Sequence, residues 1–401
     1  MFKPLPWEYG IRNLFRRPLR SALTLAGLTT VIVLVFVVVG FIRGLERSLA
    51  VSGDPQVLLV YSLGMGENLE YSSIPAKTAD LVSANVDNVQ QRFGKKYASP
   101  ELFLGTQVGV SSQEARKSRE SSDESQEPED AMGLVRGITQ SVLLVRAQVE
   151  IVEGDWPGPG EVIVGRLAAT KLGTDNQHLG IGNSLTFEGK TWRISGTFSA
   201  CGSVFESELW CRLDDLQQAM KRQDLSLVAI KLTPSGDFSD VDLFCKERLD
   251  LELQAIREAD YYAMLQKDYG PVRTLAWFTV LLISAAGVFA GLNTMYGAVL
   301  GRVRELATLQ TIGFVRRAIV LSLIQEGTIL GVAASLLASL IAFAVVHGTA
   351  VRFTMGAFEL SVDSASVLFA CATGFLLGLI GSIPPAIRVL QLPVVDGLKA
   401  V

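Results

Sequence analysis

The chain has 401 residues, a mean hydropathy of +0.34 and a charged fraction of 19%. Soluble domains carry about 25% charged residues, so this composition argues against an ordinary soluble protein and fits membrane helices joined to a soluble domain. The formal net charge of −4 decides little by itself, because the charges are unevenly spread.

At the start of the chain, residues 1–20 place Trp7, Tyr9 and Phe15 among several arginines. This pattern is typical of an amphipathic helix lying on a membrane surface; a frayed tail with interfacial aromatic residues is the alternative. The apolar stretch that follows is longer than the core of a signal peptide, and no clear cleavage site comes after it. We therefore expect a retained membrane helix rather than a cleaved leader.

Four apolar stretches are long enough to cross a bilayer, which needs about 20 apolar residues per helix. They predict transmembrane helices at 21–43, 273–300, 318–346 and 364–387. The fold class is therefore a membrane protein with four helices in a one-plus-three order and a large α+β extracytoplasmic domain, residues 44–272, between the first and second helices. The remaining segments are 301–317, an outer loop at 347–363 and a tail at 388–401.

The placement of basic residues orients the chain, because lysine and arginine gather on the cytoplasmic side of membrane helices. Four segments agree with one topology, with both termini and 301–317 inside and with 44–272 and 347–363 outside. The inside residues are Lys3, Arg12, Arg16, Arg17, Arg20, Arg302, Arg304, Arg316, Arg317, Arg388 and Lys399. The expected location is the cell (inner) membrane, so the lipid bilayer is one of the expected partners of this chain.

The extracytoplasmic domain reads as short strands and helices. Residues 111–130 have almost no apolar side chains, so we expect a disordered insertion. We expect a strand over Leu143–Val152, a hairpin at Ser184–Phe198 and one long amphipathic helix over Ser239–Leu265. The aspartates and glutamates are scattered as on a solvated surface.

No cluster of residues predicts catalysis, a metal site or a cofactor. Gly189-Lys190-Thr191 is similar to the end of a phosphate-binding loop, but Ser184 stands where the first glycine is required and no helix follows. We therefore expect no ATPase in this chain, no enzyme activity and no nucleic-acid partner. Cys201 and Cys211 flank a predicted hairpin in the outer domain, where disulfides can persist; a disulfide between them and two free thiols are both compatible with the sequence.

Residues 301–317 form the most informative segment. Apolar residues recur every third position while the charged residues lie elsewhere, which predicts a short amphipathic helix on the inner side that ends near Gly313. The alternatives are a contact for a motor subunit and an interfacial helix without a partner. Glu326 follows in the third apolar stretch, where we expect it at the inner interface, paired with Arg316, Arg317 or a neighbouring helix.

Glycines also recur at four-residue spacing in the later apolar stretches. The pairs are Gly287/Gly291, Gly297/Gly301, Gly327/Gly331 and Gly374/Gly378. Such pairs allow close helix contacts, within the chain or across a dimer.

These residues resemble the FtsX-like permeases of MacB-type (type VII) ABC transporters. The likeness is carried by Arg304-Glu305-Leu306, Ile312-Gly313, Arg316-Arg317 and Gln325-Glu326-Gly327, and by Gly160–Gly165 and Gly196-Thr197-Phe198 in the outer domain. It covers nearly the whole chain. Asn183 and the 111–130 insertion depart from the family pattern.

The resemblance implies a non-catalytic permease subunit that works with a separate cytoplasmic ABC ATPase and a second permease copy or homologue, with a membrane-fusion adaptor as a further candidate partner. The implied ATPase-coupling residues are Arg302, Arg304, Glu305, Leu309, Gly313, Arg316 and Arg317. ATP-driven motion of the outer domain would then export or extract a substrate. The alternative is a signalling protein of FtsX type that activates an outer partner, such as a cell-wall hydrolase, without transport.

Overall fold

The computed structural model describes residues 12, 14–16, 18–66, 68–111, 131–353 and 356–391. The expected insertion after Ser111, most of the N-terminal segment and the tail after residue 391 lie outside the described residues. The chain divides into two compact units. The helical unit comprises Met1–Arg43, Pro271–Thr349 and Leu360–Val401, and the sheet unit comprises Gly44–Gly270 and Ala350–Glu359.

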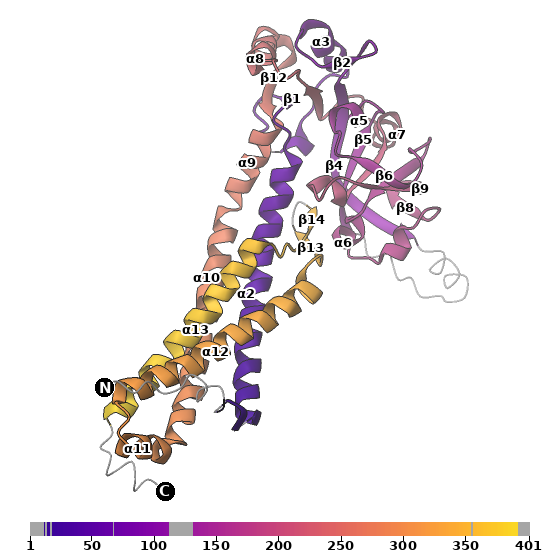
Figure 1. The fold of residues 1–401 in the computed structure, drawn as a ribbon. Helices are drawn as coiled ribbons and strands as arrows, with labels where there is room; N and C mark the ends of the chain where they lie inside the picture. Colours follow the sequence, from indigo (N-terminus) through magenta and orange to yellow (C-terminus); the bar gives the residue numbers. More distant parts are fainter. Residues whose placement is uncertain are drawn as a thin grey trace, which may run out of the picture. The chain divides into compact units, whose positions relative to one another are not determined.

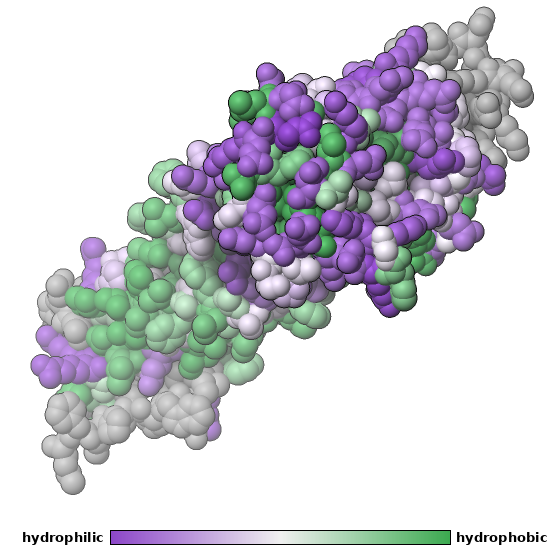
Figure 2. All heavy atoms as spheres, turned by 90° about the horizontal axis from the view of Figure 1, so that it is seen from above, coloured by the Kyte–Doolittle hydropathy of each residue, from purple (hydrophilic) through white to green (hydrophobic). Residues whose placement is uncertain are grey.

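Each of the four apolar stretches lies in a helix. The helices are α2 (Pro18–Ser52), α10 (Gly270–Leu300), α12 (Arg316–Ile341), which continues as a π-helical turn over Ala342–Val346, and α13 (Ser364–Gln391). By length and composition, these four helices of the described chain could each cross a membrane. Figure 2 shows hydrophobic side chains over the surface of this part of the chain. The finding agrees with a membrane protein.

Two of the helices pack through glycines. A Cβ atom added at Gly331 on α12 would lie 2.3 Å from the carbonyl oxygen of Gly374, and one added at Gly378 would lie 2.4 Å from that of Gly327, so only glycine fits at this crossing. Helix α11 (Val303–Thr311) joins α10 to α12. Leu306 packs with residues of α10 and α12 in one apolar cluster.

The sheet unit is built on one sheet with, among the described residues, ten strands in the order β12-β1-β11-β4-β5-β10-β7-β9-β6, with β8 paired to β4 and β9. The strands are β1 (Val57–Ser62), β4 (Ala98–Ser111), β5 (Ala131–Ile138), β6 (Glu150–Gly154), β7 (Glu161–Gly165), β8 (Ser184–Phe187), β9 (Lys190–Ser199), β10 (Glu208–Arg212), β11 (Leu227–Lys231) and β12 (Leu253–Arg257). Alternating strand residues fill one apolar cluster on each side.

Short helices complete this unit (Figure 1). They are α3 (Thr78–Asn85), α5 (Val142–Val145), α6 (Ala168–Leu172), α7 (Leu213–Met220), α8 (Phe238–Glu247) and α9 (Glu258–Asp268), with a small hairpin of β2 (Gln91–Arg92) and β3 (Lys95–Lys96) and 3-10 turns at Leu69–Tyr71, Asn176–Leu179, Val204–Ser207 and Leu249–Leu251. The hairpin expected at Ser184–Phe198 is confirmed as β8 and β9.

Two expectations about this unit were wrong. The long helix over Ser239–Leu265 is split into α8, β12 and α9, because β12 pairs along its whole length with β1 and tertiary pairing overrides the helical pattern. The strand over Leu143–Val152 begins instead as helix α5, and β6 starts only at Glu150. The first correction matters for function, because it places the strand that follows α2 beside the strand that precedes α9.

The segment between α12 and α13, expected to be an outer loop, contributes a hairpin to the sheet unit. β13 (Ala350–Phe353) pairs with β14 (Gly356–Glu359), and the hairpin packs on α6 and on the turn at Val204–Ser207. The chain therefore passes between the two units at four places, after residues 43, 270, 349 and 359.

Candidate functional site

The segment 301–317 separates into a packed face and a free face. Leu306 is buried and Leu309 is half-buried against the membrane helices. Gly313 has φ +103°, a left-handed conformation that favours glycine, and it ends α11 as expected. The helix is therefore held against the other helices of this unit and presents its remaining side chains outward.

Four charged side chains of this segment are exposed: Arg304, Glu305, Arg316 and Arg317. None of them makes an ion pair or a side-chain hydrogen bond with any residue that the structure describes. Three cations and one anion are thus available to another molecule on one short segment. Charged groups of this kind steer association and fix register at protein interfaces.

Arg302 behaves differently from the other predicted coupling residues. Its guanidinium is 7% exposed and forms two hydrogen bonds to the carboxylate of Glu326, with Nη1–Oε2 at 3.0 Å and Nη2–Oε1 at 2.9 Å. Glu326 is 4% exposed. Its partner is therefore neither Arg316 nor Arg317 but the residue that precedes α11. This two-bond pair ties the start of α11 to the middle of α12.

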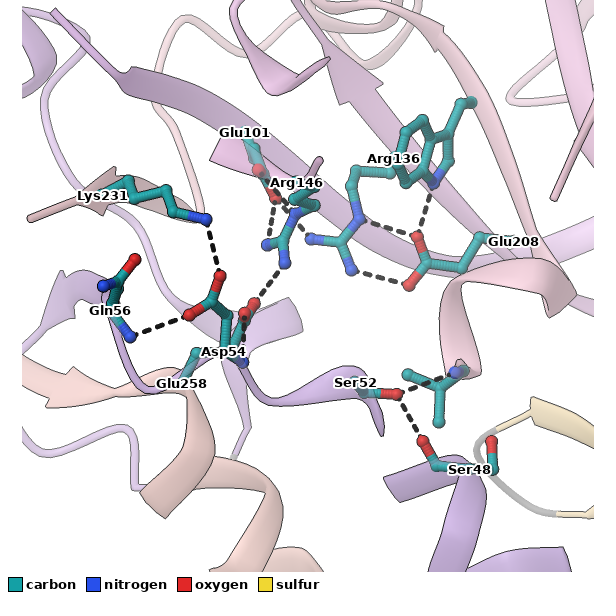
Figure 3. A network of polar contacts seen from close by, with 12 residues as sticks. Ser48, Ser52, Asp54, Gln56, Glu101, Arg136, Arg146, Glu208, Lys231 and Glu258 are labelled. Carbon is teal, nitrogen blue, oxygen red and sulfur yellow. Dashed lines mark hydrogen bonds and ion pairs between the residues drawn. The ribbon is translucent and has the colours of Figure 1, made fainter. Parts of the chain in front are cut away.

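A second cluster, missed by the sequence analysis, lies in the sheet unit (Figure 3). Arg136 on β5 donates from Nη1 to Glu101 on β4 at 2.7 Å. It also donates from Nε and Nη2 to the two carboxylate oxygens of Glu208 on β10, at 2.7 and 2.6 Å. Trp210 Nε1 donates to Glu208 at 2.7 Å. The three central strands are thus joined by fully buried ion pairs.

Arg146 connects these strands to two further chain segments, the start of α9 and the residues that follow α2. It donates from Nε and Nη2 to Glu101 at 3.3 and 3.2 Å and from Nη1 to Glu258, the first residue of α9. Glu258 also accepts a hydrogen bond from the backbone N–H of Asp54, two residues after α2, at 3.3 Å. The Asp54 carboxylate pairs with Lys231 at 2.7 Å. We call Glu101, Arg136, Arg146, Glu208 and Glu258 the buried charge cluster.

Aromatic rings and burial set the electrostatics of this cluster. The Arg146 guanidinium lies 4.3 Å from the centre of the Phe205 ring, and Arg136 lies 4.5 Å from that of Phe103. Burial alone raises the pKa of Glu101, but Arg146 and Arg136 outweigh it and lower the pKa. Burial is the larger effect at Glu258 and raises its pKa despite Arg146. Scattered acids on a solvated surface were therefore the wrong expectation for these glutamates.

Backbone packing supports the same junction. A Cβ atom added at Gly53 would lie 2.7 Å from Cα of Ala259, so the end of α2 and the start of α9 are in close contact. β1, which follows α2, lies between β11 and β12, and β12 runs directly into α9. The buried charge cluster thus joins both chain segments that lead to the membrane helices to the centre of the sheet.

The β13–β14 hairpin is attached through a third group of charges. Arg166 Nη2 lies 3.0 Å from Glu359 on β14 and 3.0 Å from Glu206. Glu206 is buried and also accepts hydrogen bonds from the N–H groups of Ala200 and Gly202 and from the Ser199 hydroxyl, at 2.8, 3.0 and 2.8 Å. Although burial raises the pKa of Glu206, these donors and Arg166 lower it overall.

The Glu206 geometry predicts an acid-sensitive contribution to stability. Because its folded-state pKa is lowered, the folded state releases this proton more readily, and stability falls as the pH falls below the ordinary glutamate pKa of about 4.3. We expect the wild-type chain to lose more stability than Glu206→Gln between about pH 5 and about pH 3. Pulse proteolysis in urea at several pH values measures this; equal pH slopes in the two proteins would contradict it.

The cysteines form no bridge in the structure. Cys201 is exposed and its Sγ lies 3.9 Å from the carbonyl oxygen of Gln148, whereas Cys211 is buried within the sheet core. Both are free thiols, so the disulfide alternative is not the one the structure adopts. Burial raises the pKa of the Cys211 thiol above its ordinary range, which keeps it protonated and unreactive.

Comparison with known proteins adds two family matches. Residues 21–242 match the MacB-like periplasmic core domain, and residues 277–394 match the FtsX-like permease C-terminal domain. Together they cover most of the chain. No curated protein matches the sequence.

Solved structures of low identity are also similar to this chain. The periplasmic region of MacB from Actinobacillus actinomycetemcomitans is 8% identical, with a TM-score of 0.38, covering 54% of this chain and 94% of that one. The extracellular domain of the noncanonic ABC-type transporter YknZ from Gram-positive bacteria is 12% identical, with a TM-score of 0.35, covering 50% and 99%. A permease domain from Porphyromonas gingivalis is 14% identical, with a TM-score of 0.33, covering 50% and 88%. With TM-scores this low, the assignment rests on the family matches.

Proposed function

Because this chain belongs to the FtsX-like permease family with a MacB-like periplasmic core domain, we propose that it is the permease subunit of an ABC transporter in the cell (inner) membrane. Its helices cross the membrane in a one-plus-three order with both termini inside. The sheet unit lies outside. ATP hydrolysis in a separate cytoplasmic subunit moves the sheet unit and thereby exports or extracts a substrate.

The observation that carries this proposal is the free face of the segment 301–317. Arg304, Glu305, Arg316 and Arg317 are exposed and unpaired within the described chain, while Leu306 anchors the same segment in the membrane helices. A helix packed in this way can transmit a displacement of a bound subunit to α10 and α12. The docking surface consists of these four charges and the exposed Gly313. Leu309 packs on the opposite face with Leu306, and Arg302 supports the segment from within through Glu326.

The sheet unit is suited to receive such motion. Its buried charge cluster links Asp54 after α2, Glu258 at the start of α9 and the three central strands. Ion pairs in a low-dielectric interior require fixed geometry, because an unpaired buried charge is costly. We therefore expect the sheet to follow the two membrane helices as one body rather than deform.

We predict that charge reversal on the free face weakens ATPase binding. Glu305→Arg and Arg316→Glu should each reduce affinity for the cognate ATPase about tenfold, which corresponds to ~1.4 kcal/mol, because opposed charges at the interface become like charges. Titration of the detergent-solubilised permease with the ATPase by microscale thermophoresis measures this. Arg193→Glu, on the exposed surface of β9, is the matched control. Unchanged affinity in both variants would refute the docking surface.

The same framework supports a second function, in which the moving sheet unit activates an outer partner such as a cell-wall hydrolase and nothing is transported. The specific observation in its favour is the attached β13–β14 hairpin, which gives the sheet unit four chain connections through which motion can be delivered. Vesicles with purified permease and ATPase separate the two functions. ATP turnover that activates a hydrolase without substrate movement would favour signalling over transport.

A further inference from the structure

A cavity of about 340 Å³ lies within the sheet unit. It opens where two neighbouring parallel strands end, β5 at Ile138 and β10 at Arg212, and these two residues are register partners. The turn 156–160, which precedes β7, forms another wall. In open sheets with parallel strands, ligands bind outside the carboxyl ends of the strands, and small-molecule sites measure roughly 300–1,000 Å³. Position and size both indicate a ligand site.

The turn that forms this wall is held in place from both sides. Pro157 is buried, and its ring fixes the backbone φ angle. The Gly158 N–H donates to the Glu161 carboxylate at 3.0 Å. The Gly160 N–H donates to the Asp215 carboxylate on α7 at 2.9 Å. The wall is therefore formed before a ligand arrives, and a preformed site loses less affinity to ordering of the protein.

Trp156, on the same turn, offers an apolar ring and an indole N–H without a partner. The side chain is half-buried, since it packs on the apolar cluster around Trp210 and also lines the cavity. Its Nε1 makes no hydrogen bond with any described residue, whereas Nε1 of Trp192 and Nε1 of Trp210 both do. Because a buried or half-buried indole N–H usually has an acceptor, this one points to an acceptor on a bound molecule.

The polar residues of the cavity are Gln140, Arg212 and Asp214. Arg212 Nη2 lies 3.7 Å from the Asp214 carboxylate, too far for a hydrogen bond. None of these three side chains makes a hydrogen bond within the part of the chain that the structure describes. A ligand with one charge would be attracted by Arg212 or Asp214 and repelled by the other. A neutral ligand whose groups both donate and accept can bond to both.

We propose that this cavity binds a saccharide, with one sugar ring stacked on Trp156 and its hydroxyls bonded to Arg212 and Asp214. A pyranose has an apolar face of C–H bonds and an edge of hydroxyls, each able to donate and to accept. The apolar face matches Trp156 and the buried side chains of Ile138 and Leu213. Saccharide binding goes beyond the proposed transport function and needs no ATPase, because every lining residue belongs to the sheet unit.

Saturation-transfer difference NMR on the full chain tests this binding. The chain is placed in lipid nanodiscs, because maltoside detergents themselves carry a disaccharide. The probes are maltose, cellobiose and N,N′-diacetylchitobiose, with leucine as the zwitterionic competitor. We expect transfer to at least one disaccharide, strongest at the C–H protons of the stacked face. No transfer to any of the disaccharides, or stronger transfer to leucine, would overturn the proposal.

Variants locate the binding at the cavity. Asp214→Asn and Arg212→Gln should each weaken disaccharide binding about fivefold, the loss expected when one net hydrogen bond is removed. The Asp214 side chain is 80% exposed, so this variant should keep its unfolding temperature. Asp250→Asn and Arg248→Gln are the matched controls, because they alter another arginine–aspartate pair two residues apart, outside the cavity. Trp156→Phe, which keeps a ring but loses the N–H, should bind more tightly than Trp156→Ala. Equal affinity of Asp214→Asn and Asp250→Asn would refute the site.

Discussion

Replacing Arg146 with methionine is expected to destabilise the sheet unit by about 3–5 kcal/mol, the range found when one partner of a buried ion pair is removed. The guanidinium is 2% exposed and serves Glu101 and Glu258 together. Methionine fills similar volume but leaves two buried carboxylates with fewer donors. Pulse proteolysis of the full chain in urea, following fragments of the sheet unit, measures the loss.

The matched control is Arg222→Met. Arg222 pairs with Asp224 at 2.5 Å, but its side chain is 30% exposed, and partly exposed pairs contribute only about 0–1 kcal/mol. A loss for Arg146→Met no larger than for Arg222→Met would show that the cluster does not hold the sheet together. Restoration of stability by Glu258→Gln in the Arg146→Met background would instead support the charge-based account, because it removes the carboxylate that loses its ion-pair partner, whereas Glu101 keeps Arg136.

The sequence contains a signal for this cluster in the apolar runs that hold its two arginines. Arg136 stands in the apolar run Leu134–Ile138, and Arg146 follows Val142–Val145. A single arginine inside an apolar run has to be buried with a partner, because an isolated buried charge is too costly. The sequence could thus have flagged both arginines. It could not have named their partners, since Glu101 and Glu258 are distant in the chain and meet only through the order of the strands.

The helical unit was easier to predict, because length and hydropathy suffice for membrane helices. The end of α11 at Gly313 also followed from sequence, since a glycine with positive φ terminates helices. β12 was missed for the opposite reason. Its residues fit a helical pattern, and only the neighbouring edge of β1 makes the extended conformation favourable. Local sequence patterns thus predicted the membrane helices and the end of α11, which depend on local interactions. They did not predict β12, which depends on pairing with a strand distant in the sequence.

Arg302→Met should show whether Arg302 stabilises the segment 301–317 through Glu326 rather than binding the ATPase directly. Its removal leaves the Glu326 carboxylate buried without its two hydrogen bonds, and the expected cost is about 3–5 kcal/mol. The variant should therefore unfold at lower temperature in detergent. Arg304→Met removes an exposed charge, so it should leave the unfolding temperature unchanged and weaken ATPase binding.

The double variant Arg302→Met/Glu326→Met completes this test. If the pair acts as one buried unit, removing both charges should recover most of the stability lost in Arg302→Met, because no unpaired charge remains. ATPase-driven turnover then reports on mechanics rather than folding. A recovered unfolding temperature with impaired coupling indicates that the link between α11 and α12 itself transmits force. Full recovery of the unfolding temperature and of ATPase-driven turnover would show that the Arg302–Glu326 pair contributes to stability alone. If the losses of stability in the two single variants add in the double variant, the two residues do not act as a pair.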